Sequence, residues 1–145
     1  MTLVELLAEP ASKNEVVADC VRVIEEEVAA RPGFSGVALR TGYKAFQKMR
    51  PNVTRSAIVR LMPDMAPVLD QHWAEAGASG DRAAWFDTQR GRVADDLLAV
   101  TDRLAGRSRN AVLLRLYKSL RGSARDHVMA GVPRLADLLR LHLGA

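Results

Sequence analysis

Two histidines, His72 and His142, stand at matching places in the sequence, each nine residues after a proline. A histidine pair of this kind can bind a metal ion or relay a proton if the fold brings the two rings together. Zinc sites, however, use three or four ligands, and neither histidine has further His, Cys or carboxylate residues at ligand spacing. A position near a helix C-terminus favours histidine through the helix dipole alone. We therefore predict structural roles for both, with no metal and no cofactor.

The other reactive side chains are also better explained by structure. Cys20, the sole cysteine, lies on an apolar helical stripe and has acidic neighbours, which disfavour the thiolate that a nucleophile needs. Glu25, Glu26 and Glu27 are consecutive, so on a helix their side chains diverge by about 100° and do not converge on one ion. A single cysteine excludes an intrachain disulfide and fits a reducing cytoplasm.

A Tyr-Lys dipeptide occurs twice, as Tyr43-Lys44 and Tyr117-Lys118. Adjacent helical residues point apart, so we expect each tyrosine ring to pack inward while the lysine stays in water. Glycine-rich phosphate loops, nucleophile elbows and metalloprotease helices are all missing from the sequence. The sequence therefore predicts a protein that is not an enzyme.

These dipeptides belong to a longer internal repeat. Three motifs recur in the same order, at offsets of 76, 74 and 70 residues: 17–19 with 93–95, 43–44 with 117–118, and 63–72 with 133–142. A fixed-order repeat predicts two similar halves, residues 1–76 and 81–145, related by a pseudo-two-fold axis. Because a half of about 70 residues would have a marginal core alone, we expect one domain over residues 1–145.

The apolar spacing is helical almost throughout, and no segment alternates as a strand would. The predicted fold is an all-α bundle with three to four helices in each half. Each half would hold a short opening helix (2–8 and 81–88), two longer helices and a third that Pro63 or Pro133 breaks or kinks. The other predicted boundaries are a capping box at 12–15, a stop at 31–34 with Ser35 as the next cap, and an end at Pro51-Asn52. A turn is predicted at 77–80, with Asp81 as the cap of the helix that follows.

The charge pattern repeats as well. The chain alternates between acidic and basic segments: seven acids and two bases in 1–30, seven bases and no acid in 31–60, eight acids and three bases in 61–102, and seven bases and no acid in 103–125. Two interpretations stay open. The acidic and basic helices could neutralise each other across the bundle, or the two basic helices could form one surface that attracts anions.

We favour a non-enzymatic binding or interaction protein that contacts an anionic macromolecule or protein partner through its basic helices, 35–50 and 108–125. Nucleic acid would be held through its phosphates, but no helix-turn-helix, zinc finger or aromatic-basic RNA motif is present. An anionic membrane is a further possibility, although no single helix combines a basic face with bulky Trp, Phe and Leu residues. The candidate contact residues are Arg40, Lys44, Lys48, Arg55, Arg115, Lys118, Arg121 and Arg125.

The alternative function is a small-molecule or lipid carrier. Few aromatics, several methionines and the proline breaks could leave an apolar cavity between the halves; the methionines are Met49, Met62, Met65 and Met129. The first residues lack the features of a signal peptide and no apolar run approaches about 18 residues, so we expect a cytoplasmic protein without a transmembrane segment. An exposed apolar stripe would be compatible with a homodimer.

Four segments carry a resemblance to a known family: Val17-Ala18-Asp19, the helix from Ser35 to Arg50, Leu61-Met62-Pro63-Asp64 and Ala99-Val100-Thr101-Asp102. Together they resemble a family of small actinobacterial proteins of unknown function over nearly the full length. The resemblance implies a cytoplasmic protein from a GC-rich bacterium, which agrees with the excess of arginine over lysine. It carries over no catalytic or binding residue.

Overall fold

The structure is a computed structural model that describes residues 1–49 and 52–144, and within these ranges the chain forms helices and turns but no strand. The predicted all-helical class is therefore confirmed for the described residues. The helices are α1 (Leu3–Leu7), α2 (Pro10–Ala30), α3 (Gly33–Met49), α4 (Val53–Ala78), α5 (Arg82–Thr88), α6 (Arg90–Ala105) and α7 (Ala111–Leu143). None of the helices in this part of the chain is long and apolar enough to cross a bilayer.

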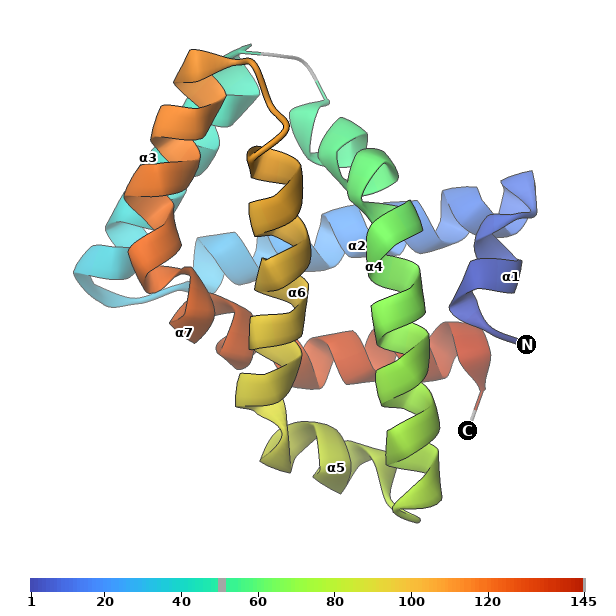
Figure 1. Ribbon diagram of the computed structural model, residues 1–145. Helices are drawn as coiled ribbons and strands as arrows, with labels where there is room; N and C mark the ends of the chain where they lie inside the picture. Colours follow the sequence, from blue (N-terminus) through green and yellow to red (C-terminus); the bar gives the residue numbers. More distant parts are fainter. Residues whose placement is uncertain (50–51, 145) are drawn as a thin grey trace.

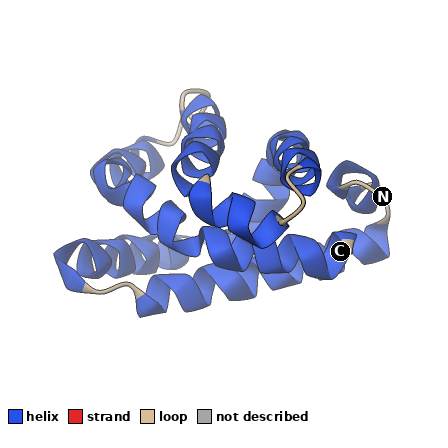
Figure 2. Ribbon diagram, turned by 90° about the horizontal axis from the view of Figure 1, so that it is seen from below, coloured by secondary structure: helices blue, strands red, loops and turns tan. Residues whose placement is uncertain are grey.

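The long helices lie in two layers that cross each other (Figures 1 and 2). Helices α4 and α6 run side by side in one layer and cross over the other layer, which α2 and the C-terminal part of α7 form. Each layer therefore combines one helix from the first part of the chain with one from the second. Short α1 packs against α2 and α4, and short α5 packs against α4 and α7.

The core lies where these two layers meet. Its side chains come from both parts of the chain, and the buried ones include Val16 and Val17 of α2, Leu69 of α4, Phe86 of α5, Val93 of α6 and Leu139 of α7. Each buried side chain of this size contributes roughly 1.5–3 kcal/mol by leaving water. The apolar stripes of α2, α4, α6 and α7 are thus buried against one another.

The start of the chain differs from the predicted boundaries. Helix α1 has a capping box in which the Thr2 hydroxyl accepts from the Glu5 backbone N–H at 3.1 Å, while the Glu5 carboxylate accepts from the Thr2 N–H at 3.4 Å. The capping box predicted at 12–15 is wrong, because α2 already begins at Pro10. Proline suits the first turn because its missing N–H would be unpaired there. Ser12 instead donates its hydroxyl hydrogen to Glu9 Oε2, at 3.3 Å.

Among the later boundaries, the cap at Asp81 is confirmed, since Asp81 Oδ1 accepts from the Ala84 N–H at 3.1 Å at the start of α5. The cap at Ser35 is wrong, because α3 begins two residues earlier at Gly33, where φ is +75°. The predicted stop at Pro51 lies outside the described residues. Asn52 precedes α4 with a left-handed backbone (φ 58°), which asparagine tolerates better than most residues.

The prolines do not break the helices as predicted. Helix α4 continues through Pro63 and Pro67, and α7 continues through Pro133. All three prolines are exposed, so the carbonyl groups that lose an N–H partner lie on the solvent side and can bond to water. Helix α7 bends in its middle, so its first part lies beside α3 and its second part beside α2 (Figure 1). One bent helix thus replaces two predicted ones.

Candidate anion-binding surface

Helix α3 and the first part of α7 lie side by side and run in opposite directions (Figure 1). They approach most closely at Gly42, where an added Cβ would lie 2.8 Å from Leu120 Cδ1. We call α3 together with residues 111–125 the basic arm. Because the helices are antiparallel, this contact sets three pairs of bases at matching heights along the arm: Arg40 with Arg121, Lys44 with Lys118, and Lys48 with Arg115.

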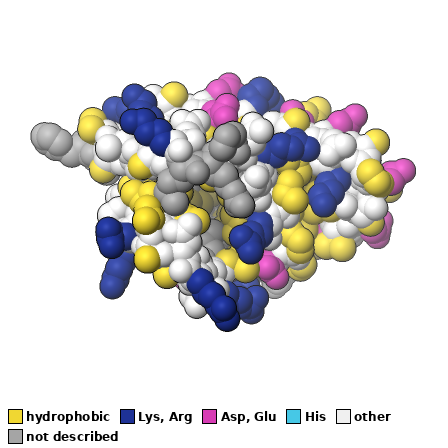
Figure 3. Space-filling view, turned by 90° about the horizontal axis from the view of Figure 1, so that it is seen from above, with side chains coloured by type: hydrophobic (Ala, Val, Ile, Leu, Met, Phe, Trp, Pro, Cys, Tyr) yellow, Lys and Arg dark blue, Asp and Glu magenta, His cyan; other side chains and the backbone are white. Residues whose placement is uncertain are grey.

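The basic arm holds seven Lys and Arg residues and no Asp or Glu. Four of these bases are exposed and form no ion pair with a residue that the structure describes: Lys44, Lys48, Arg115 and Lys118. Figure 3 looks onto the end of the molecule where α3 ends and α7 begins, and its left part carries basic and apolar side chains with almost no acidic ones. Bases from two distant segments therefore share one region.

Two predicted contact residues are instead neutralised by α6. Arg121 forms two hydrogen bonds with the Asp102 carboxylate, at 2.9 and 3.1 Å, and Arg125 bonds to Asp95 at 2.8 Å. The hydrogen bonds from Arg121 and from a tyrosine hydroxyl lower the pKa of Asp102, and the bond from Arg125 lowers the pKa of Asp95. On the side of the arm that faces α6, the basic and acidic helices therefore neutralise each other.

Arg40 and Arg55 have structural contacts. The Arg40 guanidinium donates to the backbone carbonyl of Arg31, which follows the last turn of α2. Arg55 lies on α4, outside the arm, and donates to Asn14 Oδ1 at 3.1 Å. Neither contact involves a carboxylate, and each connects neighbouring helices: Arg40 joins α3 to the end of α2, and Arg55 joins α4 to α2.

The two tyrosines of the repeated dipeptide attach the arm to the rest of the molecule. The Tyr117 hydroxyl lies 2.7 Å from Thr101 Oγ1 and also donates to the carboxylate of Asp102, while the Tyr43 hydroxyl bonds to Thr54. Burial, as the largest cause, raises the pKa of both phenols. Each tyrosine therefore faces the body of the protein, whereas the lysine that follows it is exposed.

The arm also exposes apolar side chains. Val37 and Val112 are 52% and 50% exposed, and Leu113 is 37% exposed. Among the arm residues whose burial the structure describes, only Gly36 and Gly42 are buried, so no described side chain of the arm is fully covered. The arm is therefore a thin layer of two helices, with apolar and basic groups together on its outer side.

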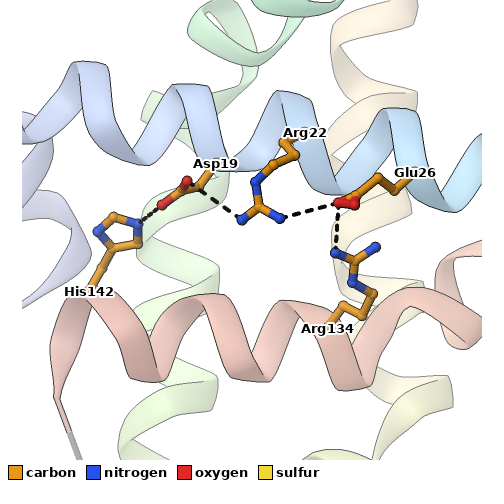
Figure 4. A network of polar contacts seen from close by, with 5 residues as sticks. All are labelled: Asp19, Arg22, Glu26, Arg134 and His142. Atoms are coloured by element: carbon orange, nitrogen blue, oxygen red, sulfur yellow. Dashed lines mark hydrogen bonds and ion pairs between the residues drawn. The ribbon is translucent and has the colours of Figure 1, made fainter.

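Among the described residues, the ion pairs of the acidic helix α2 are with bases of α2, of the connection after it and of α7, and none is with a base of α3. Glu26 pairs with Arg22 at 3.2 Å and with Arg134 of α7 at 3.0 Å, and Asp19 lies 2.7 Å from Nε2 of His142 (Figure 4). The hydrogen bond from Arg134 is the largest cause that lowers the pKa of Glu26. These contacts join α2 to the second part of α7, and Lys44 and Lys48 of α3 stay exposed.

The repeat-matched histidines each contact an aspartate from the other part of the chain. His142 of α7 meets Asp19 of α2, and Nε2 of His72 on α4 lies 3.0 Å from Oδ2 of Asp96 on α6. His72 is fully buried, and burial lowers its pKa despite the nearby carboxylate of Asp96. No cluster of three metal-ligating side chains occurs in residues 1–49 and 52–144. The contacts shown connect helices rather than forming a joint histidine site.

Two hollows bear on the carrier alternative. One, of about 320 Å³, lies between α4, α5 and α7 and is lined by Trp73, Arg82 and Arg140 among others. The second, of about 330 Å³, lies between α6 and the arm and includes Lys118 and Arg121. Both are open and contain charged side chains, unlike the apolar pocket of a lipid carrier. Of the methionines invoked for that role, Met62 is buried in the core, Met65 and Met129 are half-buried, and the side chain of Met49 lies outside the described set.

Comparison with known proteins gives one match. A family model described as a family of unknown function, DUF6918, matches residues 3–143. No curated protein and no solved structure matches the chain. The match therefore supplies neither a ligand nor a reaction.

Proposed function

We propose that this chain, which belongs to the DUF6918 family of unknown function, is a binding protein that holds an anionic macromolecule against its basic arm. The observation that carries the proposal is the side-by-side placement of α3 and residues 111–125, which brings together Lys44, Lys48, Arg115 and Lys118 without a carboxylate in the arm. The single cysteine agrees with a role in a reducing cytoplasm.

The electrostatics of the arm support this role. Bases four residues apart on a helix lie roughly 6 Å from each other, which is within the Debye length of about 8–10 Å at physiological salt. Their potentials therefore add at the surface instead of being screened separately. Keeping like charges this close destabilises the folded chain slightly, and an anionic partner would remove that repulsion.

The internal ion pairs fit the same proposal. Arg121 and Arg125 bond to α6, and the Tyr117 hydroxyl bonds to Asp102 at the same place. These contacts fix the rotation of α7. Arg115, about 160° from Tyr117 around the helix, then faces away from α6, while Lys118 is exposed beside α6 at the hollow that it lines with Arg121. Part of the predicted basic surface thus orients the arm, and the remaining part is free to bind.

We also propose that the two parts of the chain are related by a pseudo-two-fold axis, as the sequence repeat predicts. Two observations support it. Each repeat-matched histidine contacts an aspartate of the other part, His142 with Asp19 and His72 with Asp96, which is one residue after Asp95, the counterpart of Asp19. The register at Gly42 also sets Lys44 level with its repeat-matched counterpart Lys118. The axis would then pass through the arm and give it similar bases on both edges.

The test is retention on a heparin column, with salt-gradient elution. One variant replaces Lys44, Lys48, Arg115 and Lys118 by glutamine. A matched control replaces four bases outside the arm, namely Lys13, Arg22, Arg90 and Arg140, and therefore has the same net charge. We expect the arm variant to elute at much lower salt than wild type and the control to elute close to wild type, with equal helicity by circular dichroism. Equal elution of the two variants would show that net charge alone governs retention and would overturn the proposal.

A further inference from the structure

We propose that the anionic partner is the surface of a lipid bilayer that contains anionic headgroups, and that the arm lies flat on it with Val37 and Val112 inserted between the headgroups. The inference rests on the proposed function and specifies its partner. Electrostatics alone does not explain the apolar side chains of the arm: both valines are half-exposed on a surface that also carries the four unpaired bases.

Helix geometry places these valines beside the unpaired bases. On α3, Val37 and Lys44 are seven residues apart and so lie about 20° from each other around the helix axis, with Lys48 on the same side. On α7, Val112 and Arg115 are three residues apart and lie about 60° from each other. On each helix of the arm, an exposed valine therefore lies close to at least one exposed basic side chain.

This amphipathic side is turned away from the rest of the protein. Gly42 faces α7, and Lys44 lies about 200° further around α3, on the opposite side of that helix. Tyr43, which points about 100° from Gly42, bonds to Thr54 of α4 and so marks the side of α3 that is attached to the body. The remaining side of the helix is free to meet a flat surface.

A bilayer matches this combination better than the other anionic polymers. The phosphates of a nucleic acid would pair with the Lys and Arg side chains, but a nucleic acid offers no apolar phase for the valines. The arm also has no exposed tryptophan or tyrosine on which nucleobases could stack. A membrane surface attracts Lys and Arg through its headgroups and also buries apolar side chains at the acyl boundary. Long basic side chains at the arm edges can reach the headgroups while their methylene stems lie against lipid.

From the sequence, an anionic membrane is a possible partner, although no single helix there combines a basic face with bulky Trp, Phe and Leu residues. No single helix has a bulky apolar face, but the Gly42–Leu120 contact joins two helices into one surface, with exposed Leu113 beside Val112. Two modest amphipathic helices held rigidly together lose less conformational entropy on binding than two independent ones. The pair can therefore bind a bilayer that either helix alone would bind weakly.

The test is co-sedimentation with two kinds of vesicle. One consists of phosphatidylcholine alone, and the other of phosphatidylcholine and phosphatidylglycerol in equal amounts. We expect wild type to sediment only with the anionic vesicles. Replacing Val37 and Val112 by serine should weaken that binding at least about fivefold while leaving heparin elution unchanged. A matched control, with serine at the exposed apolar positions Val4 and Leu141 outside the arm, should bind vesicles as wild type does.

Each other outcome has a definite meaning. Retention on heparin without vesicle binding would overturn the inference but leave the proposed function standing, with a nucleic acid or an acidic protein as partner. Failure to bind either material would overturn both. Vesicle binding that the Val37→Ser and Val112→Ser changes leave intact would show purely electrostatic contact and would refute insertion.

Discussion

Gly42 of α3 lies against Leu120 of α7, so closely that a Cβ at position 42 would come within 2.8 Å of the leucine side chain. The two residues are 78 positions apart, and each belongs to a segment with many bases and no acid. Their contact turns two separate basic helices into one arm. The proposed function and the proposed bilayer contact both depend on it.

We predict that Gly42→Leu separates the two helices of the arm. The added side chain would occupy the space of Leu120, and overpacking of this kind destabilises by about 1–3 kcal/mol. We also expect weaker retention on heparin, because the two rows of bases would no longer face the same partner. Chemical denaturation followed by circular dichroism measures the first effect, and salt-gradient elution measures the second.

Gly122→Ala is the matched control, because Gly122 also lies within a helix of the arm but an added Cβ would meet no atom within 4 Å. Alanine should stabilise this position by roughly 0.5–1 kcal/mol, since it has less conformational freedom to lose than glycine. A Gly42→Leu variant as stable as Gly122→Ala would contradict the close approach.

His72 predicts a dependence of stability on pH. Burial lowers its pKa in the folded chain, whereas in the unfolded chain the histidine has its ordinary pKa of about 6.5. As the pH falls below that value, the unfolded state takes up the proton first, and stability falls by up to about 1.4 kcal/mol per pH unit until the folded pKa is reached. The free energy of unfolding, measured between pH 7.5 and pH 5, should therefore decrease on acidification.

The contribution of His72 is isolated by His72→Gln, which fills the site with a neutral side chain that does not titrate. Its stability is expected to be lower at pH 7.5 but to change less between pH 7.5 and pH 5. Arginines lower the pKa of several carboxylates, among them Asp95, Asp102 and Glu26, below their ordinary values, so these groups act in a more acidic range. An unchanged pH slope in the variant would show that the buried histidine is not the titrating group.

Cys20 should be an unreactive thiol. Burial, with a smaller effect from Asp19, raises its pKa to about 12, so at pH 8 only a minute fraction is thiolate. We expect its reaction with a chromogenic disulfide reagent to be at least about 100-fold slower in the native protein than in concentrated guanidinium chloride. Native and denatured rates within about tenfold of each other would mean that the thiol is accessible.

The helical class of the fold could be predicted from the sequence because amphipathic periodicity is a local property. The cap at Asp81 was predictable for the same reason, since one side chain and the next turn determine it. The continuation through Pro63 and Pro133 was not. A proline breaks a helix only if nothing compensates, and here the packing of α4 and α7 on both sides of the prolines outweighs the lost hydrogen bond.

The candidate site could be predicted only in part. The charge segments identified both basic helices, and the four unpaired bases were all among the predicted residues. Which bases are neutralised depends on tertiary contacts, such as Arg121 with Asp102 and Arg125 with Asp95, that lie 19 and 30 residues apart. Gly42 was the missed signal: a glycine within an amphipathic helix marks a place where another helix comes close.

The most direct test of the central claim is an NMR titration of isotopically labelled protein with a short heparin oligosaccharide. The two basic segments are predicted to form one surface, so the amide shifts should change together in α3 and in residues 111–125, with one shared dissociation constant. Amide shift changes that are confined to one of the two segments, or that spread over α1, α5 and the second part of α7, would contradict the claim of one shared surface.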